Sequence, residues 1–238
     1  MVTPILPVSL SDVVVKRRGK TLLGPLDLTV PSGGCTIVMG PNGSGKTTFL
    51  RTLHGLERLN QGAITWSVPV EAARSRQTFV FQTPIMMRRS VRDNLAFPLL
   101  VSGASRAEAL RSAQDWADRI GLENALERYA PRLSGGEKQK LALARALIST
   151  PDVVFLDEPC ANLDGQSTRE IEMILKEAQA SGTRILMSTH DVGQAKRLAD
   201  DVLFFMHGEI IESGNAAAFF AAPKTPQASA LLRGDIVE

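Results

Sequence analysis

The chain has 238 residues, enough for one large domain or for one domain with an inserted lobe. Its 44% hydrophobic and 22% charged residues are typical of a globular protein with a normal core and argue against disorder. The 27 Lys and Arg residues nearly balance 25 Asp and Glu, so the net charge is only +2, and no basic run suits nucleic acid. No apolar run approaches the ~20 residues of a membrane span, and the N-terminus lacks the features of a signal peptide. Cys35 and Cys160 are too few for a disulfide framework, so we expect two buried, reduced thiols in a cytosolic protein.

The opening of the chain has the pattern of antiparallel β structure. Strands are predicted over residues 10–15 and 26–30, with a basic turn at residues 16–20 between them. The segment Pro31-Ser32-Gly33-Gly34 reads as a hairpin-like turn after the second strand.

A phosphate-binding loop follows. A β-branched run at residues 36–38 leads into it and a helical run at residues 48–56 leads out, which is the context that this motif requires. Glycines allow the tight turn, the backbone N–H groups face phosphates, Lys46 supplies a positive charge, and the Thr47 hydroxyl can bind Mg²⁺. The alternative is a glycine-rich turn that only joins a strand to a helix. The loop residues are Gly40, Pro41, Asn42, Gly43, Ser44, Gly45, Lys46, Thr47 and Thr48.

The middle of the chain changes from strand to helix. Short strands are predicted at residues 63–66 and 78–81, the second ending at Gln82. Residues 84–149 have a helical pattern, with Ser90 and a Ser105–Glu108 capping box as helix starts and Gly121 as a stop. This pattern predicts a helical insertion in an α/β domain.

The segment Ser134-Gly135-Gly136-Glu137 opens the last helix of that insertion, which should run to residue 148. Ser134 and Glu137 could form a capping box and nothing more. However, each glycine costs roughly 1 kcal/mol in a helix relative to alanine, so two in the first turn need a reason. Close approach of an anion to this turn is one such reason.

The last third alternates strands and helices. A continuously apolar strand at residues 153–156 ends in Asp157 and Glu158, which is typical of a strand buried in a parallel sheet. A helix follows around residues 171–178, and then a strand at residues 184–188 that ends close to His190. Residues 202–206 and 209–212 should form a hairpin, and short helices are expected after residue 215.

Polar side chains therefore follow the strands of one sheet. Because the carboxyl ends of parallel strands share one edge, we expect them to meet at a single nucleotide. Asp157, Thr47 and Gln82 suit Mg²⁺, Glu158 can orient or deprotonate the attacking water, and His190 can contact the γ-phosphate. Taken alone, each has a structural alternative: an acid capping a turn, a surface glutamine or a buried histidine.

These motifs together resemble an ATP-binding cassette (ABC) transporter ATPase subunit, and the resemblance covers nearly the whole chain. The matching segments are residues 40–47 (Walker A), Gln82 (Q-loop), residues 133–139 (signature), residues 153–158 (Walker B), residues 161–164 (D-loop) and His190 (H-loop). The resemblance implies an α/β P-loop NTPase core with an antiparallel β subdomain, formed by residues 1–83 and 150–238, and an inserted helical subdomain at residues 84–149.

The resemblance also implies how the site works. ATP with Mg²⁺ would lie between the Walker A loop of one subunit and Ser134, Gly135 and Gly136 of another in a head-to-tail homodimer. Glu158 would be the general base, and Asp164 would connect the two sites. The chain departs from the family in having Arg18 where an aromatic residue usually stacks on adenine, so we expect the guanidinium of Arg18 or Arg17 to stack instead.

With no membrane span of its own, a transport ATPase needs separate membrane permease subunits. We expect a peripheral protein on the cytoplasmic face of the inner membrane, with residues 82–89, including Pro84, Met86 and Met87, receiving a permease helix. The family style is that of a bacterial importer with a separate solute-binding protein. The chain looks most like the ATPase of an oxyanion importer, with tungstate as the first candidate and phosphate, sulfate and amino-acid importers behind it. The alternatives are a non-transport ABC ATPase in DNA repair, chromosome organisation or translation, and a P-loop kinase or GTPase; the last leaves the Ser134 segment and His190 unexplained.

Overall fold

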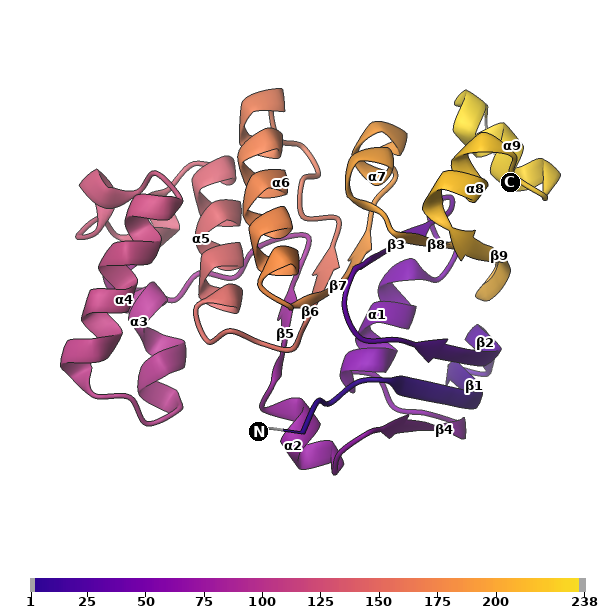
Figure 1. The fold of residues 1–238 in the computed structure, drawn as a ribbon, viewed down its shortest axis with the longest axis horizontal. Helices are drawn as coiled ribbons and strands as arrows, with labels where there is room; N and C mark the ends of the chain where they lie inside the picture. Colours follow the sequence, from indigo (N-terminus) through magenta and orange to yellow (C-terminus); the bar gives the residue numbers. More distant parts are fainter. Residues whose placement is uncertain (1–2, 236–238) are drawn as a thin grey trace.

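The computed structural model describes residues 3–235 and contains two β-sheets with helices packed around them (Figure 1). The larger sheet has six strands in the order β5-β6-β7-β3-β8-β9; neighbouring strands are parallel except at β9, which is antiparallel to β8. Its strands are β3 (Cys35–Met39), β5 (Gln77–Val80), β6 (Val153–Asp157), β7 (Arg184–Ser188), β8 (Asp201–Met206) and β9 (Glu209–Asn215).

The smaller sheet is antiparallel, as the sequence predicts. Its three strands have the order β2-β1-β4, with bounds β1 (Val8–Arg17), β2 (Lys20–Val30) and β4 (Gln61–Trp66). The predicted hairpin-like turn at residues 31–34 is wrong, because β2 and β3 belong to different sheets and this segment passes from one to the other. All five residues of β3 are buried, so both faces of the strand must be covered. The layers that pack on the two faces of the larger sheet provide this cover.

Both faces of the larger sheet are covered by apolar residues. In β6, Val153 and Phe155 pack towards α1 (Lys46–His54) and the small sheet, while Val154 and Leu156 pack towards the opposite helical layer. This alternation explains why residues 153–156 of β6 are all apolar. The helices of the opposite layer are α5 (Gly135–Leu147), α6 (Gly165–Ala180), α7 (Val192–Leu198) and α8 (Ala216–Ala221).

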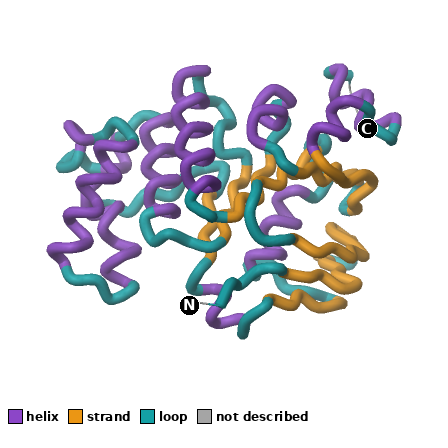
Figure 2. The backbone as a smooth tube through the Cα atoms, in the orientation of Figure 1, coloured by secondary structure: helices purple, strands orange, loops and turns teal. Residues whose placement is uncertain are grey.

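The helical segment forms the end of the molecule farthest from β9 (Figures 1 and 2). It contains α3 (Val91–Val101), α4 (Arg106–Arg119) and 3-10 turns at Glu123–Ala125 and Ala130–Arg132. The predicted caps are confirmed: the Ser90 hydroxyl accepts from Asp93 N, and Ser105 and Glu108 form a capping box. Because α5 packs on α3 and also on β5 and α6, the division into residues 84–149 and the remainder stays a proposal.

Two further short helices lie outside these layers. The sequence pattern does not predict α2 (Val70–Arg74), whereas α9 (Pro226–Arg233) is one of the short helices expected after residue 215. Glu212 of β9 holds the start of α9, since its carboxylate accepts from Lys224 N at 2.8 Å and from Thr225 N and Oγ1 at 2.9 and 2.8 Å. Burial alone would raise the pKa of Glu212, but these hydrogen bonds outweigh it and keep that pKa below its ordinary value.

The two cysteines differ in burial. Cys35 is buried as predicted, whereas Cys160 is only half-buried; both are free thiols. Within residues 3–235, no helix has both the length and the apolar character that a membrane crossing requires.

Candidate functional site

The loop between β3 and α1 has the shape of an anion cradle. Gly40 has φ 143°, and a Cβ there would lie 2.3 Å from the carbonyl oxygen of Phe205, so only glycine fits. Gly45 is left-handed, with φ 109°, and directly precedes α1. The loop thus presents backbone N–H groups and the N-terminus of α1 to one space.

Lys46 is buried in this loop, with 6% of its surface exposed. Its Nζ donates to the carbonyl oxygens of Gly40 and Pro41, both at 2.9 Å. Burial lowers the pKa of Lys46, and the negative charges of Glu158 and Asp157 partly oppose that shift. The ammonium group is held by two neutral carbonyl oxygens, so an anionic phosphate would be a stronger partner.

Asp157 lies at the end of β6 and is 4% exposed. Its Oδ1 accepts hydrogen bonds from Thr47 Oγ1 at 2.9 Å and from Ser188 Oγ at 2.8 Å. A hydroxyl and a carboxylate oxygen on adjacent elements are the ligand types that Mg²⁺ takes beside a nucleotide phosphate. In the described part of the chain, no three His, Cys, Asp or Glu side chains form a cluster that could hold a metal ion.

Gln82, Glu158 and His190 meet beside the loop. Gln82 Nε2 donates to Glu158 Oε2 at 3.3 Å, and His190 Nδ1 lies 3.2 Å from the same oxygen. The backbone of Glu158 has φ 45°, and its N–H donates to Ser188 Oγ at 3.0 Å. Ser188 therefore holds both acids at the end of β6, a role that the sequence analysis missed because the residue reads as one more strand position.

One cavity of about 720 Å³ contains most of the predicted residues. Neither Arg17 nor Arg18 lines it: Arg18 occupies the turn between β1 and β2, and the Arg17 guanidinium lies 3.1 Å from the Glu57 carboxylate. Stacking of Arg18 on a base therefore stays a prediction. Besides the loop of residues 40–48, the lining consists of Leu22, Gln82, Glu158, Ala161, Asn162, His190 and Leu231.

The start of α5 lies outside this cavity. Ser134 and Glu137 form the expected capping box, with Ser134 N donating to the Glu137 carboxylate at 2.7 Å. Gly136 has a packing reason, because a Cβ there would lie 2.9 Å from Ser167 Oγ. Gly135 has no such packing reason, since a Cβ added there would have no atom of the described chain within 4 Å. This turn is therefore open to an approaching group.

Asp164, predicted to connect two sites, caps α6 here. Its Oδ1 accepts from Ser167 N at 2.8 Å and from Gln166 N at 2.9 Å, and the backbone hydrogen bond from Ser167 is the main cause that lowers the pKa of Asp164. Its role between two copies of the chain stays a prediction.

A separate groove of about 750 Å³ lies between α1, β5, α3 and α5. Pro84, Ile85 and Met87 line it, whereas Met86 packs against the core instead. Ile85 is 66% exposed and Val101, also in the lining, is 71% exposed, so the groove presents an apolar surface.

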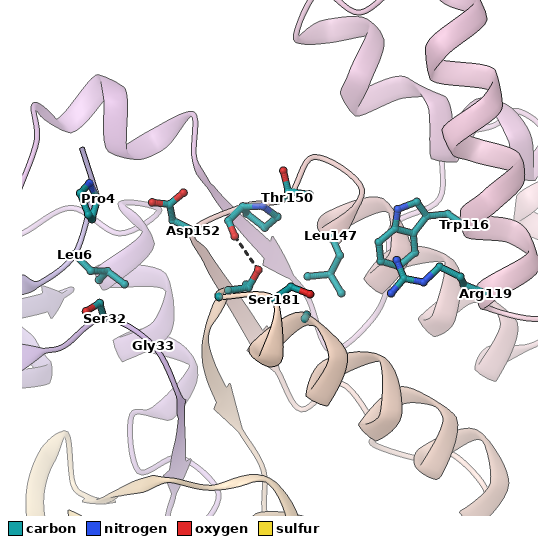
Figure 3. Close-up of a pocket in the computed structure, with 14 residues that line it drawn as sticks. Pro4, Leu6, Ser32, Gly33, Trp116, Arg119, Leu147, Thr150, Asp152 and Ser181 are labelled. Carbon is teal, nitrogen blue, oxygen red and sulfur yellow. Dashed lines mark hydrogen bonds between the residues drawn. The ribbon is translucent and has the colours of Figure 1, made fainter. Parts of the chain in front are cut away.

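Another pocket, of about 340 Å³, lies at the opposite edge of the sheet, where β6 and β7 begin (Figure 3). Trp116 stacks under the Arg119 guanidinium at one side, and Leu6 and Asp152 lie at the other. None of the predicted site residues lines it.

Comparison with known proteins shows the family of the chain. The family model described as "ABC transporter" matches residues 23–161. The arginine transport ATP-binding protein ArtM of Bacillus subtilis is 36% identical over 228 residues, covering 91% of this chain and 95% of ArtM. The tungstate uptake system ATP-binding protein TupC of Peptoclostridium acidaminophilum is 35% identical over 215 residues, covering 90% of this chain and 99% of TupC.

Solved structures agree in fold. An ATP-binding subunit of an ABC transporter superposes with a TM-score of 0.83 at 23% identity, covering 96% of this chain and all of that one. CbiO1 of Clostridium perfringens, part of an ABC transporter complex, superposes with a TM-score of 0.80 at 26% identity, covering 97% of this chain and 95% of CbiO1. The chain therefore belongs to the ABC transporter family, as an ATP-binding subunit that hydrolyses ATP to drive transport.

Proposed function

We propose that this chain powers solute import as the ATPase of a membrane complex, working as a head-to-tail homodimer on the cytoplasmic face of the inner membrane. The observation that carries the proposal is the meeting of Gln82, Glu158 and His190 at one wall of the cavity that the phosphate-binding loop forms. Separate permease subunits would form the pathway, and a solute-binding protein would deliver the cargo.

Each side chain has one role in the proposed reaction. Lys46 and the loop N–H groups bind the phosphates, and Thr47, Asp157 and Gln82 would hold Mg²⁺, which neutralises charge on the β- and γ-phosphates. Glu158 accepts the proton of the attacking water, and His190 donates a hydrogen bond to the γ-phosphate. Ser134, Gly135 and Gly136 of a second copy would close the site from the other side, and Asp164 would link the two sites.

The cargo is not recognised by these residues. ArtM is named for arginine and TupC for tungstate, at nearly equal identity. Tungstate or a related oxyanion and an amino acid are therefore the two cargo classes that we propose to test. Nothing supports the non-transport alternative.

The apolar groove at Ile85 gives the most direct test of the membrane partner. Ile85→Asp should abolish co-purification with the permease subunits, because a charge in the groove would be desolvated by the docked helix. Met173→Asp is the matched control, since Met173 is 62% exposed on α6 and lies outside the groove. Both variants should bind ATP. Normal co-purification of the Ile85→Asp protein would contradict this docking surface.

Nucleotide choice is a further test, because the cavity offers many groups to phosphates and few to a base. No Phe, Tyr or Trp side chain of the described chain lines it. We therefore expect GTP to bind within about tenfold of ATP, a difference of ~1.4 kcal/mol. Arg18→Ala should weaken both nucleotides together, because stacking on a guanidinium tolerates any base. Competition binding of ATP against GTP measures the difference, and a hundredfold preference for ATP would require a group that reads adenine besides Arg17 and Arg18.

A further inference from the structure

A second cavity adjoins the nucleotide cavity. Its volume is about 510 Å³, and Gln82, Ala161 and Asn162 line both spaces. Gln82 is also the residue that donates to Glu158 at the catalytic end of the nucleotide cavity. The second space therefore begins where the γ-phosphate is cleaved in the proposed reaction. We call it the cationic cavity, for two basic residues of its lining, Arg88 and Lys138.

The charges of the cationic cavity are not balanced. No Asp or Glu belongs to its lining, and neither Arg88 nor Lys138 lies within 4 Å of a carboxylate of residues 3–235. Neighbouring basic residues differ in this respect: Arg128 pairs with Glu137 at 3.2 Å, and Lys140 pairs with Glu170 at 2.9 Å. Two cations in one concave space without an acid form a site for an anion.

A buried amide in the same lining also lacks a partner. Gln139 is 3% exposed, and its Nε2 makes no hydrogen bond to any described residue. Buried amide donors are nearly always satisfied in folded proteins, so an unsatisfied one in a cavity wall indicates a group that binds there. An anion oxygen is the acceptor that fits, because the cationic side chains can only donate.

Hydrogen bonds hold the backbone segments that carry the two cations. Met87, next to Arg88, is fixed by Asn94, whose Oδ1 accepts from Met87 N at 3.1 Å and whose Nδ2 donates to Met87 O at 3.3 Å. Lys138 lies in the first turn of α5, where its N–H donates to Ser134 O at 2.9 Å. Hydrogen bonds within the chain therefore fix the backbone beside Arg88 and at Lys138.

We propose that the cationic cavity binds inorganic phosphate, and that phosphate leaves the catalytic end of the nucleotide cavity by this route after hydrolysis. The inference rests on the proposed roles of Gln82 and Glu158. Hydrolysis joins the water oxygen to the γ-phosphorus and breaks its bond to the oxygen that ADP keeps, so two anions are left side by side. The cationic cavity draws the smaller anion away from ADP and from the Glu158 carboxylate.

The test is equilibrium binding of radiolabelled inorganic phosphate to the ADP-loaded protein. The Arg88→Met, Lys138→Met double variant should bind phosphate at least about tenfold more weakly, because both cations are lost. The matched control is Arg89→Met with Arg132→Met, which removes the same charge from two nearby exposed residues that do not line the cavity. This control should bind phosphate as the unaltered protein does, and melting temperatures check that both variants fold.

Unchanged phosphate affinity in the Arg88→Met, Lys138→Met variant would overturn the inference. An equal loss of phosphate affinity in the control variant would do the same, because it would mean a general charge effect. Loss of permease binding with unchanged phosphate affinity would also overturn it, since the occupant would then be a carboxylate of the membrane subunit. The Glu158→Gln protein separates this inference from the proposed function. If that protein hydrolyses ATP normally, the catalytic assignment fails, while its phosphate affinity still tests the cavity.

Discussion

Lys46→Ala should abolish ATP hydrolysis and weaken nucleotide binding by about a hundredfold, equivalent to ~3 kcal/mol. The ammonium group is buried at the loop and donates hydrogen bonds to two carbonyl oxygens that belong to the loop itself. When a triphosphate binds, this is the nearest cation available to it, and alanine leaves the phosphate charge without that partner. Isothermal titration with ATP and Mg²⁺ measures the affinity, and phosphate release measures turnover.

Lys176→Ala is a suitable control because Lys176 is exposed on α6, away from the cavity. It removes the same charge and should leave both affinity and turnover unchanged. Normal turnover of the Lys46→Ala protein would refute the assignment of the whole nucleotide site.

Glu158→Gln should retain ATP binding and lose hydrolysis by about 10²–10⁴-fold, the usual contribution of a general base. The glutamine amide can still lie beside Gln82 and His190, but it cannot take a proton from water. Single-turnover hydrolysis with labelled ATP measures the chemical step directly, because it does not depend on product release.

The control for Glu158→Gln is Glu71→Gln, on the exposed surface of α2. It removes the same charge far from the site and should hydrolyse ATP normally. If Glu158→Gln instead weakened binding and left the rate of hydrolysis of bound ATP intact, Glu158 would be a binding residue and another base would be needed.

The arrangement of the site could be predicted because it follows from the sheet. The strands before Asp157 and His190 contain continuous apolar runs, residues 153–156 and 185–187, which indicates parallel strands whose carboxyl ends share one edge. The loop at Lys46 follows β3 in the same sheet, so its place beside them follows from the same rule. The capping boxes at Ser105 and Ser134 could be predicted because they depend only on residues three apart.

The remaining features depend on residues far apart in the chain. Ser188 could not be recognised as the partner of Asp157, because a serine at a strand end has no distinctive pattern and the two residues are 31 positions apart. The pairing of Arg17 with Glu57 removes Arg17 from the cavity, and it too joins residues 40 positions apart. Residues 31–34 have the composition of a hairpin turn but connect two different sheets, because a turn and a connection between sheets share the same local composition.

Light scattering of the Glu158→Gln protein tests the shared nucleotide site most directly. Since a ligand held between two copies stabilises their association, ATP with Mg²⁺ should convert the 25.7 kDa chain into a dimer of twice that mass. Adding Ser134→Arg to this protein should keep it monomeric, because the bulky side chain blocks the open turn at the start of α5. A Glu158→Gln protein that binds ATP and stays monomeric with Ser134 intact would contradict the sandwich of nucleotide between two copies.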